Sequence, residues 1–134
     1  MPTIFESRTL CIGINRPLEQ VYAFLAQPEN FPQWTSGLGA SLRKNGEVWI
    51  AATPEGAVTV RFTAPNVFGV LDHYVVLATG EEAYIPLRAI ANGDGCEIVF
   101  TLFRLPTITD QKFAADSAWV ERDLQALKSL LEAR

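Results

Sequence analysis

TITDQKFAADSAWVERDLQALKSLLEAR, residues 107–134, is the stretch that decides the fold of this chain. Its apolar positions recur mostly every three or four residues, which is the period of one helical face. Neither Gly nor Pro interrupts the run, Thr109 suits an N-cap, and Asp110 suits a first turn. The pattern predicts a helix over about residues 109–132. Its buried face is expected to carry Ile108, Phe113, Ser117, Val120, Leu124, Leu127 and Leu131.

A long amphipathic helix needs a broad apolar surface to cover, and most of residues 37–104 alternate between apolar and polar positions, as strands do. Short turn sequences such as Lys44-Asn45-Gly46 and Thr79-Gly80 separate the candidate strands. Such short connections join antiparallel neighbours. The sequence therefore predicts a seven-stranded antiparallel sheet, with strands at residues 3–14, 38–44, 47–53, 57–64, 69–78, 82–91 and 96–104.

Two short helices are expected after the first strand. Pro17 suits the first position of a helix over residues 17–26. Pro28 ends that helix, and residues 29–34 can form one further turn. The whole chain, residues 1–134, is thus predicted to be one α+β domain in which a curved sheet wraps around the long C-terminal helix.

Composition excludes several classes of protein. The chain has 11 basic and 15 acidic residues, for a net charge of −4, and its basic residues are scattered, which argues against a nucleic-acid surface. No run approaches the ~18 apolar residues of a membrane span, and the first residues lack the pattern of a signal peptide. Cys11 and Cys96 are interpreted as buried small hydrophobic residues rather than a disulfide or metal pair. We expect a cytoplasmic protein without a metal or cofactor.

Turn lengths predict which strand residues face the long helix. If residues 79–80 form a two-residue turn, Asp72 and Tyr74 face the helix. If residues 92–95 form a four-residue loop, Phe100 shares that face. A one-residue error in either turn would exchange the two faces of a strand.

The order of elements and the opening motif resemble the START-like, or SRPBCC, superfamily, whose fold is called helix-grip. The motif comprises residues 12–17 (IGINRP), Val21-Tyr22 and residues 28–34 (PENFPQW). Residues 66–74 (NVFGVLDHY) and 113–116 (FAAD) resemble a bacterial branch labelled polyketide cyclase-like. The resemblance implies a cavity between the sheet and the long helix that holds a hydrophobic or amphipathic small molecule.

Three polar residues are candidates for catalysis. Asp72, working with Tyr74 and Arg61, could transfer protons and stabilise an enolate in a cyclase- or dehydratase-like enzyme. Alternatively, Asp72 pairs with Arg61 on the neighbouring strand or faces solvent. His73 is the only histidine. Because it points away from Asp72 in a strand, it forms neither a catalytic dyad with it nor a multi-histidine metal site, and a place on the sheet face beside Tyr84 is the simpler interpretation.

The binding wall is predicted from aromatic and small residues near the N-terminal half of the long helix, where the inward side chains become smaller. Its members are Phe31, Trp34, Trp49, Asp72, Tyr74, Phe100, Phe113 and Ser117. Aromatic residues also fill packed cores, and this alternative stays open. Binding or transport of a small molecule is the favoured function; a cyclase-like enzyme and a protein-interaction module like the chaperone-activator members are the alternatives. We expect a monomer or a homodimer, with Trp119 as a possible contact.

Overall fold

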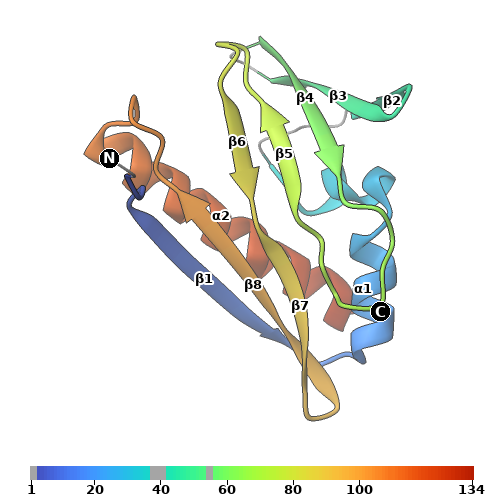
Figure 1. Ribbon diagram of the computed structural model, residues 1–134. Coiled ribbons are helices and arrows are strands. Elements are labelled where there is room, and N and C mark those ends of the chain that lie inside the picture. The colour runs from blue at the N-terminus through green and yellow to red at the C-terminus, as the bar shows by residue number, and fades with distance from the viewer. Residues whose placement is uncertain (1–2, 37–41, 54–55) are drawn as a thin grey trace.

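The computed structural model describes residues 3–36, 42–53 and 56–134, and shows an α+β fold with a long C-terminal helix (Figure 1). The elements are β1 (Ser7–Ile14), α1 (Leu18–Leu25), the 3-10 helix η1 (Pro28–Gln33), β2 (Arg43–Asn45), β3 (Val48–Thr53), β4 (Gly56–Phe62), β5 (His73–Val76), β6 (Glu82–Ile85), β7 (Leu87–Asn92), β8 (Gly95–Phe103) and α2 (Asp110–Glu132). Both short helices and the long helix lie where the sequence predicts them. Residues 38–41 of the predicted second strand lie outside the described residues.

The strands form two antiparallel sheets rather than the single seven-stranded sheet expected from the sequence. One sheet has the order β1-β8-β7 and the other the order β2-β3-β4-β5-β6. Pro86 divides them, because it has no N–H to donate to a ladder and separates β6 from β7. Pairing resumes beyond the break, where the Leu71 N–H donates to the Leu87 carbonyl at 2.7 Å and Val70 bridges to Arg88. The predicted strand over residues 82–91 is therefore two strands.

The turn between β5 and β6 is one residue longer than predicted. Residues 78–80 form the loop, since the Leu77 N–H donates to the Glu81 carbonyl at 2.8 Å. Tyr74 therefore pairs with Tyr84 instead of Ile85. A shift of one residue turns every side chain of a strand to the opposite face. The prediction that Asp72 and Tyr74 face the long helix is wrong.

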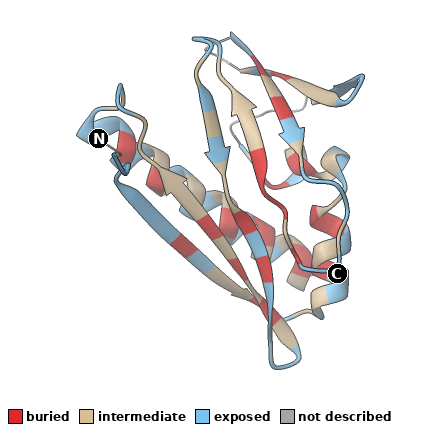
Figure 2. Ribbon diagram, in the orientation of Figure 1, coloured by how far each residue is buried: buried red, intermediate tan, exposed pale blue. Residues whose placement is uncertain are grey.

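The main core lies where α2 and α1 meet the three-stranded sheet, and Figure 2 shows buried positions along these elements. The predicted apolar stripe of α2 is buried at Phe113, Ser117, Leu124, Leu127 and Leu131. Leu87 and Ile98 are buried on the facing strands, as the predicted β7–β8 register requires. None of the helices in the described part of the chain is long and apolar enough to cross a membrane.

The two cysteines differ from each other in environment. Cys96 is buried, as predicted, whereas Cys11 is exposed. The inward side of β1 is occupied by Leu10 and Ile14, and Cys11 alternates to the other side of the strand.

Truncating a buried leucine of α2 tests the assigned helix face. Leu124 is 2 % exposed, so Leu124→Ala should lower the free energy of unfolding by roughly 2–5 kcal/mol through lost burial and the cavity left behind. The neighbouring Gln125 is exposed, and Gln125→Ala should change stability by less than about 0.5 kcal/mol. Urea titrations of the two variants measure both values. Equal losses would show that the buried face is misassigned.

Candidate functional site

A cavity of about 570 Å³ lies between the five-stranded sheet and the N-terminal half of α2. Its deep wall consists of buried or half-buried apolar and aromatic side chains. They are contributed by η1 and the residue after it, by β5 and β6, and by β8: Phe31, Trp34, His73, Val75, Ile85 and Phe100. The alternation of β5 and β6 directs these residues inward, because His73 lies opposite Ile85 and Val75 opposite Ala83.

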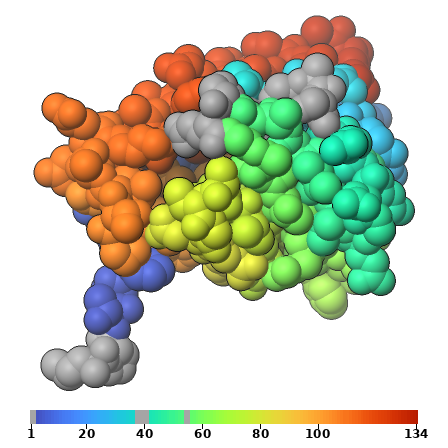
Figure 3. Space-filling view, turned by 90° about the horizontal axis from the view of Figure 1, so that it is seen from above, coloured from blue at the N-terminus to red at the C-terminus, as the bar shows by residue number. Residues whose placement is uncertain are grey.

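The rim of the cavity is polar. The Thr107 hydroxyl, which precedes α2, donates to the Glu81 carboxylate at 3.2 Å and so joins this segment to the β5–β6 hairpin. Figure 3 shows the hairpin (yellow) beside the segment that leads into α2 (orange) at this end of the molecule. Lys112 and Asp116 form an ion pair on the first turns of α2. The cavity therefore combines an apolar interior with a charged entrance, which suits an amphipathic ligand.

A network of hydrogen bonds lies on the α2 side of the cavity. The Asp123 carboxylate accepts hydrogen bonds from the Ser36 N–H at 3.2 Å and the Ser36 hydroxyl at 2.9 Å. The Trp119 indole N–H donates to the same hydroxyl. Burial raises the pKa of Asp123, although its hydrogen bonds with Ser36 oppose that shift. Trp119 remains 40 % exposed and lines the opening rather than the deep wall.

His73 is the functional candidate that sequence reasoning missed. It is 2 % exposed and lines the cavity, whereas the predicted register directs it away from the helix. Its Nδ1 lies 3.2 Å from the Leu71 carbonyl oxygen. A carbonyl can only accept, so Nδ1 carries the proton and Nε2 is left as an acceptor. The sequence signal that could have predicted this register is Gly80, because a glycine with positive φ at the third position is typical of three-residue hairpin loops.

Burial keeps the His73 imidazole neutral. Desolvation lowers the pKa of His73 to about 4, while the Leu71 hydrogen bond and the nearby Asp72 charge oppose the shift. The ring packs among aromatic neighbours, with centroids 5.3 Å from Phe31 in an edge arrangement and 5.7 Å from Phe62. At neutral pH the deep wall therefore presents an uncharged hydrogen-bond acceptor in aromatic surroundings.

Trp34 adds a second unusual polar group to this wall. The side chain is 4 % exposed and packs edge-on against Phe31 at 5.1 Å. Among the described residues, its buried Nε1–H has no hydrogen-bond partner. An unpaired buried donor is costly and therefore calls for an explanation.

Asp72 lies outside the cavity and stabilises the fold. Its carboxylate accepts hydrogen bonds from the Leu87 N–H at 2.9 Å, from Arg88 Nε and Nη2 at 2.8 Å each, and from the Tyr84 hydroxyl at 2.8 Å. Burial alone would raise the pKa of Asp72, but the hydrogen bonds from Arg88, Leu87 and Tyr84 hold it at about 2. The carboxylate is ionised and fully engaged, so it does not serve as a proton donor near neutral pH.

The other two predicted catalytic residues also lie on the outer face of the sheet. The Arg61 guanidinium lies 4.7 Å from the centre of the Tyr74 ring, and it approaches the Glu82 carboxylate at 3.7 Å. Tyr74 in turn stacks on Tyr84 at 5.0 Å. The expected Asp72–Arg61 pair is replaced by Asp72–Arg88, and none of the three predicted catalytic residues lines the cavity.

The predicted binding residues divide into two groups. Phe31, Trp34 and Phe100 line the cavity. Trp49 packs instead beside the small cluster of Ala51, Val58 and Val60. Asp72 and Tyr74 lie outside, as described above.

Phe113 and Ser117 are buried on the helix face next to the cavity-lining one. The centre of the Phe113 ring lies 5.4 Å from the Arg8 guanidinium and 5.9 Å from that of Arg104. The Ser117 hydroxyl donates to the Phe113 carbonyl at 2.9 Å. The cavity is lined by the neighbouring positions Lys112, Asp116, Trp119, Val120 and Asp123. A tryptophan at Ser117 would therefore crowd the core instead of filling the cavity.

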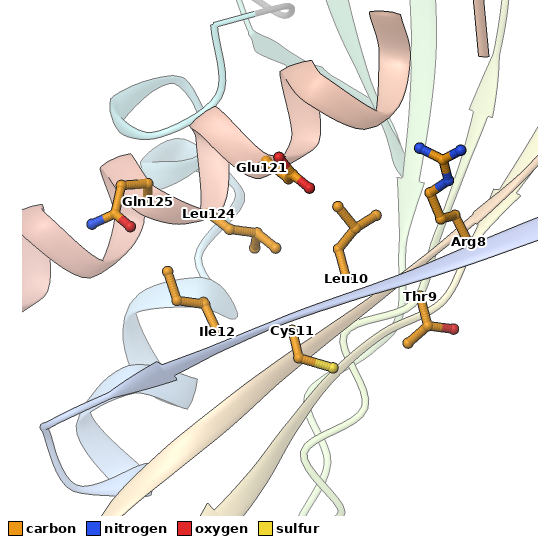
Figure 4. Close-up of a pocket in the computed structure, with 8 residues that line it drawn as sticks. All are labelled: Arg8, Thr9, Leu10, Cys11, Ile12, Glu121, Leu124 and Gln125. Atoms are coloured by element: carbon orange, nitrogen blue, oxygen red, sulfur yellow. The ribbon is translucent and has the colours of Figure 1, made fainter. Parts of the chain in front are cut away.

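A second, smaller depression lies between β1 and α2 and measures about 460 Å³. In Figure 4 the side chains of Leu10, Ile12 and Leu124 extend into the space between strand and helix, while Cys11 and Thr9 point to the other side of β1. Within the described ranges, no three His, Cys, Asp or Glu side chains are grouped so that they could hold a metal ion.

Comparison with known proteins identifies the fold but no family. No family model and no curated protein matches the sequence. Among solved structures, an uncharacterised protein from Bacillus thuringiensis matches with a TM-score of 0.75 at 16 % identity, over 93 % of this chain and 98 % of that one. The Aha1 dimer from Colwellia psychrerythraea matches with a TM-score of 0.72 at 17 % identity, over 95 % of this chain and 96 % of that one.

A protein from the dynemicin biosynthetic locus also matches, with a TM-score of 0.71 at 13 % identity. The match covers 98 % of this chain but 48 % of that protein's chain. These likenesses are consistent with a helix-grip-like fold. At such low identity they do not assign a function.

The buried neutral imidazole predicts a specific pH dependence of stability. The unfolded chain binds the His73 proton near the ordinary pKa of 6.5, whereas the folded protein binds it only near 4. Stability should therefore be highest above pH 6.5 and fall as the pH decreases towards 4, with His73 contributing up to about 3 kcal/mol of the loss. His73→Phe should remove this component, as measured by urea unfolding at a series of pH values.

Asp72→Asn serves as the matched control, because Asp72 acts in a lower pH window. Its folded pKa of about 2 lies below the ordinary 3.8, so its contribution is present above pH 3.8 and is lost as the pH falls towards 2. Asp72→Asn should lower stability at neutral pH yet leave the decline between pH 6.5 and 4 in place. An unchanged decline in His73→Phe would contradict the buried, neutral assignment.

Proposed function

We propose that this protein binds or transports a hydrophobic or amphipathic small molecule, which it holds in the cavity between the five-stranded sheet and α2. The observation that carries the proposal is the cavity itself, with about 570 Å³ of space, an apolar deep wall and a polar rim. Small-molecule sites typically fall between about 300 and 1,000 Å³ and have this distribution of polarity.

Binding is favoured over catalysis by the candidate residues. Asp72 is saturated with hydrogen bonds on the outer side of the sheet, and Tyr74 and Arg61 interact there as well. The match to a protein of a biosynthetic locus gives cyclase-like chemistry some support, but this chain would need other residues for it. His73 is the remaining candidate base in the deep wall, and burial lowers its pKa to about 4, which makes it a weak base.

A protein-interaction role has one observation in its favour. Val67 and Phe68, in the loop between β4 and β5, are 93 % and 80 % exposed. The Aha1 protein that this fold resembles is a dimer, which supports a homodimer as the form of assembly. Two exposed residues form a small patch compared with the several hundred Å² of a typical interaction site, so the cavity remains the better-supported site.

Filling the cavity should abolish binding without disturbing the fold. Ala83 lines the cavity from β6, and the phenyl ring of Ala83→Phe would occupy its space. We expect the wild-type protein to take up one molecule of the uncharged fluorescent probe N-phenyl-1-naphthylamine, and Ala83→Phe to weaken this binding about tenfold or more. Fluorescence titration measures the affinity. Native mass spectrometry of protein purified from its host, followed by solvent extraction, would detect a resident ligand.

The control is Ala57→Phe, which places the same ring on an exposed position of β4 outside the cavity lining. It should bind the probe as tightly as the wild type. If neither probe nor extracted ligand is found with the folded wild-type protein, the binding proposal fails. Equal binding by Ala83→Phe would place the binding site elsewhere.

A further inference from the structure

The deep wall of the cavity contains two polar side chains in apolar surroundings. His73 and Trp34 are 2 % and 4 % exposed, and both contact Phe31, which also lines the cavity. Burying a polar side chain costs free energy unless its polar atoms are hydrogen-bonded, and an apolar side chain would fill either position without that cost. A ligand that completes the hydrogen bonds of His73 would account for a histidine at this position, whereas Trp34 Nε1 is buried out of contact with the cavity space.

The tautomer of His73 defines what such a ligand must offer. Nδ1 donates to the Leu71 carbonyl oxygen at 3.2 Å, which leaves Nε2 as an acceptor. Among the described residues, no hydrogen-bond partner is found for Nε2. The matching ligand atom must therefore be a donor. Trp34 Nε1–H is buried out of contact with the cavity space, so it sets no requirement on the ligand.

We propose that the cavity binds an uncharged aromatic or polycyclic compound that carries a hydroxyl group at its buried end, and that this hydroxyl donates its hydrogen bond to His73 Nε2. This inference rests on the proposed binding function and deepens it by naming the ligand class. A hydroxyl group is the simplest uncharged group that can donate to Nε2. The ring system is indicated by Phe31, which packs edge-on against both His73 and Trp34, and these three residues together line the cavity with aromatic rings.

Charged ligand ends fit this wall poorly. A buried carboxylate would face the Nε2 lone pair and would need a cation, yet Lys112, the one cationic side chain lining the cavity within the described ranges, is paired with Asp116 at the rim. A buried ammonium would need an anion near His73, and Asp123 is already engaged by Ser36 on the α2 side. Any charged group of the ligand should instead lie towards the rim.

Three naphthalene derivatives separate these chemistries. 2-Naphthol can donate from its hydroxyl, 2-methoxynaphthalene keeps the oxygen but cannot donate, and 2-naphthoate is anionic. Isothermal titration calorimetry at pH 7 should show 2-naphthol binding about three- to tenfold more tightly than 2-methoxynaphthalene, the gain of one net hydrogen bond. 2-Naphthoate should bind more weakly than both. In His73→Phe the preference for 2-naphthol over 2-methoxynaphthalene should disappear while both still bind.

A spectroscopic measurement on the wild-type protein keeps the test independent of any variant. The chain has one histidine, so a long-range ¹H–¹⁵N spectrum contains a single imidazole. The Nε2 resonance should move on addition of 2-naphthol, in the direction expected for an accepted hydrogen bond, and stay near its free position with 2-methoxynaphthalene.

The outcomes distinguish the two proposals. If both uncharged compounds bind with equal affinity and Nε2 does not respond to 2-naphthol, the hydroxyl assignment is overturned while the binding function stands. Tighter binding of 2-naphthoate would also overturn it. If none of the three compounds binds, and N-phenyl-1-naphthylamine does not bind either, the proposed function fails and this inference fails with it.

Discussion

The arrangement of both sheets depends on the carboxylate of Asp72. Pro86 has no N–H to offer at the point where the two sheets meet, and at the next residue the Leu87 N–H is satisfied by Asp72 Oδ1 at 2.9 Å instead of by a backbone carbonyl. Two bonds from Arg88 and one from the Tyr84 hydroxyl attach the same carboxylate to both β6 and β7. Because charge-assisted hydrogen bonds are stronger than neutral ones, this group can hold the strands in register across the break.

That register determines the character of the cavity. With Asp72 held on the outer side, His73 and Val75 point towards α2, and the outer face carries Tyr74 and Tyr84. The two sheets then meet α2 differently. Against the three-stranded sheet the helix buries Leu124, Leu127 and Leu131 in a packed core. Against the five-stranded sheet it presents polar and aromatic side chains and leaves space. A packed half and a hollow half are thus built from adjacent faces of one helix.

The sequence predicts the elements better than it predicts the site. The unbroken apolar period predicts α2, the prolines predict where the short helices begin and end, and the loop at residues 92–95 predicts the β7–β8 register. The β5–β6 turn is different, because loops of two and three residues have similar compositions and the choice between them reverses the face of β5. Asp72 and His73 are adjacent, so an error of one residue in the register predicted Asp72 in the cavity wall, where the structure has His73. Likewise, Ser117 and Trp119 lie on neighbouring helix faces, and periodicity alone could not say which face borders the space.

Xenon binding tests most directly whether the cavity between α2 and the five-stranded sheet is open to a ligand. Xenon under pressure occupies apolar cavities and shifts the methyl resonances of the side chains around it. We predict that ¹H–¹³C methyl spectra of the ligand-free protein will show xenon-dependent shifts at Val75, Ile85 and Leu102, which line the cavity, and little change at Leu127 and Leu131 in the packed core. Unshifted methyls at the first three residues, in a protein that is otherwise folded, would show that the region is closed and would contradict the account.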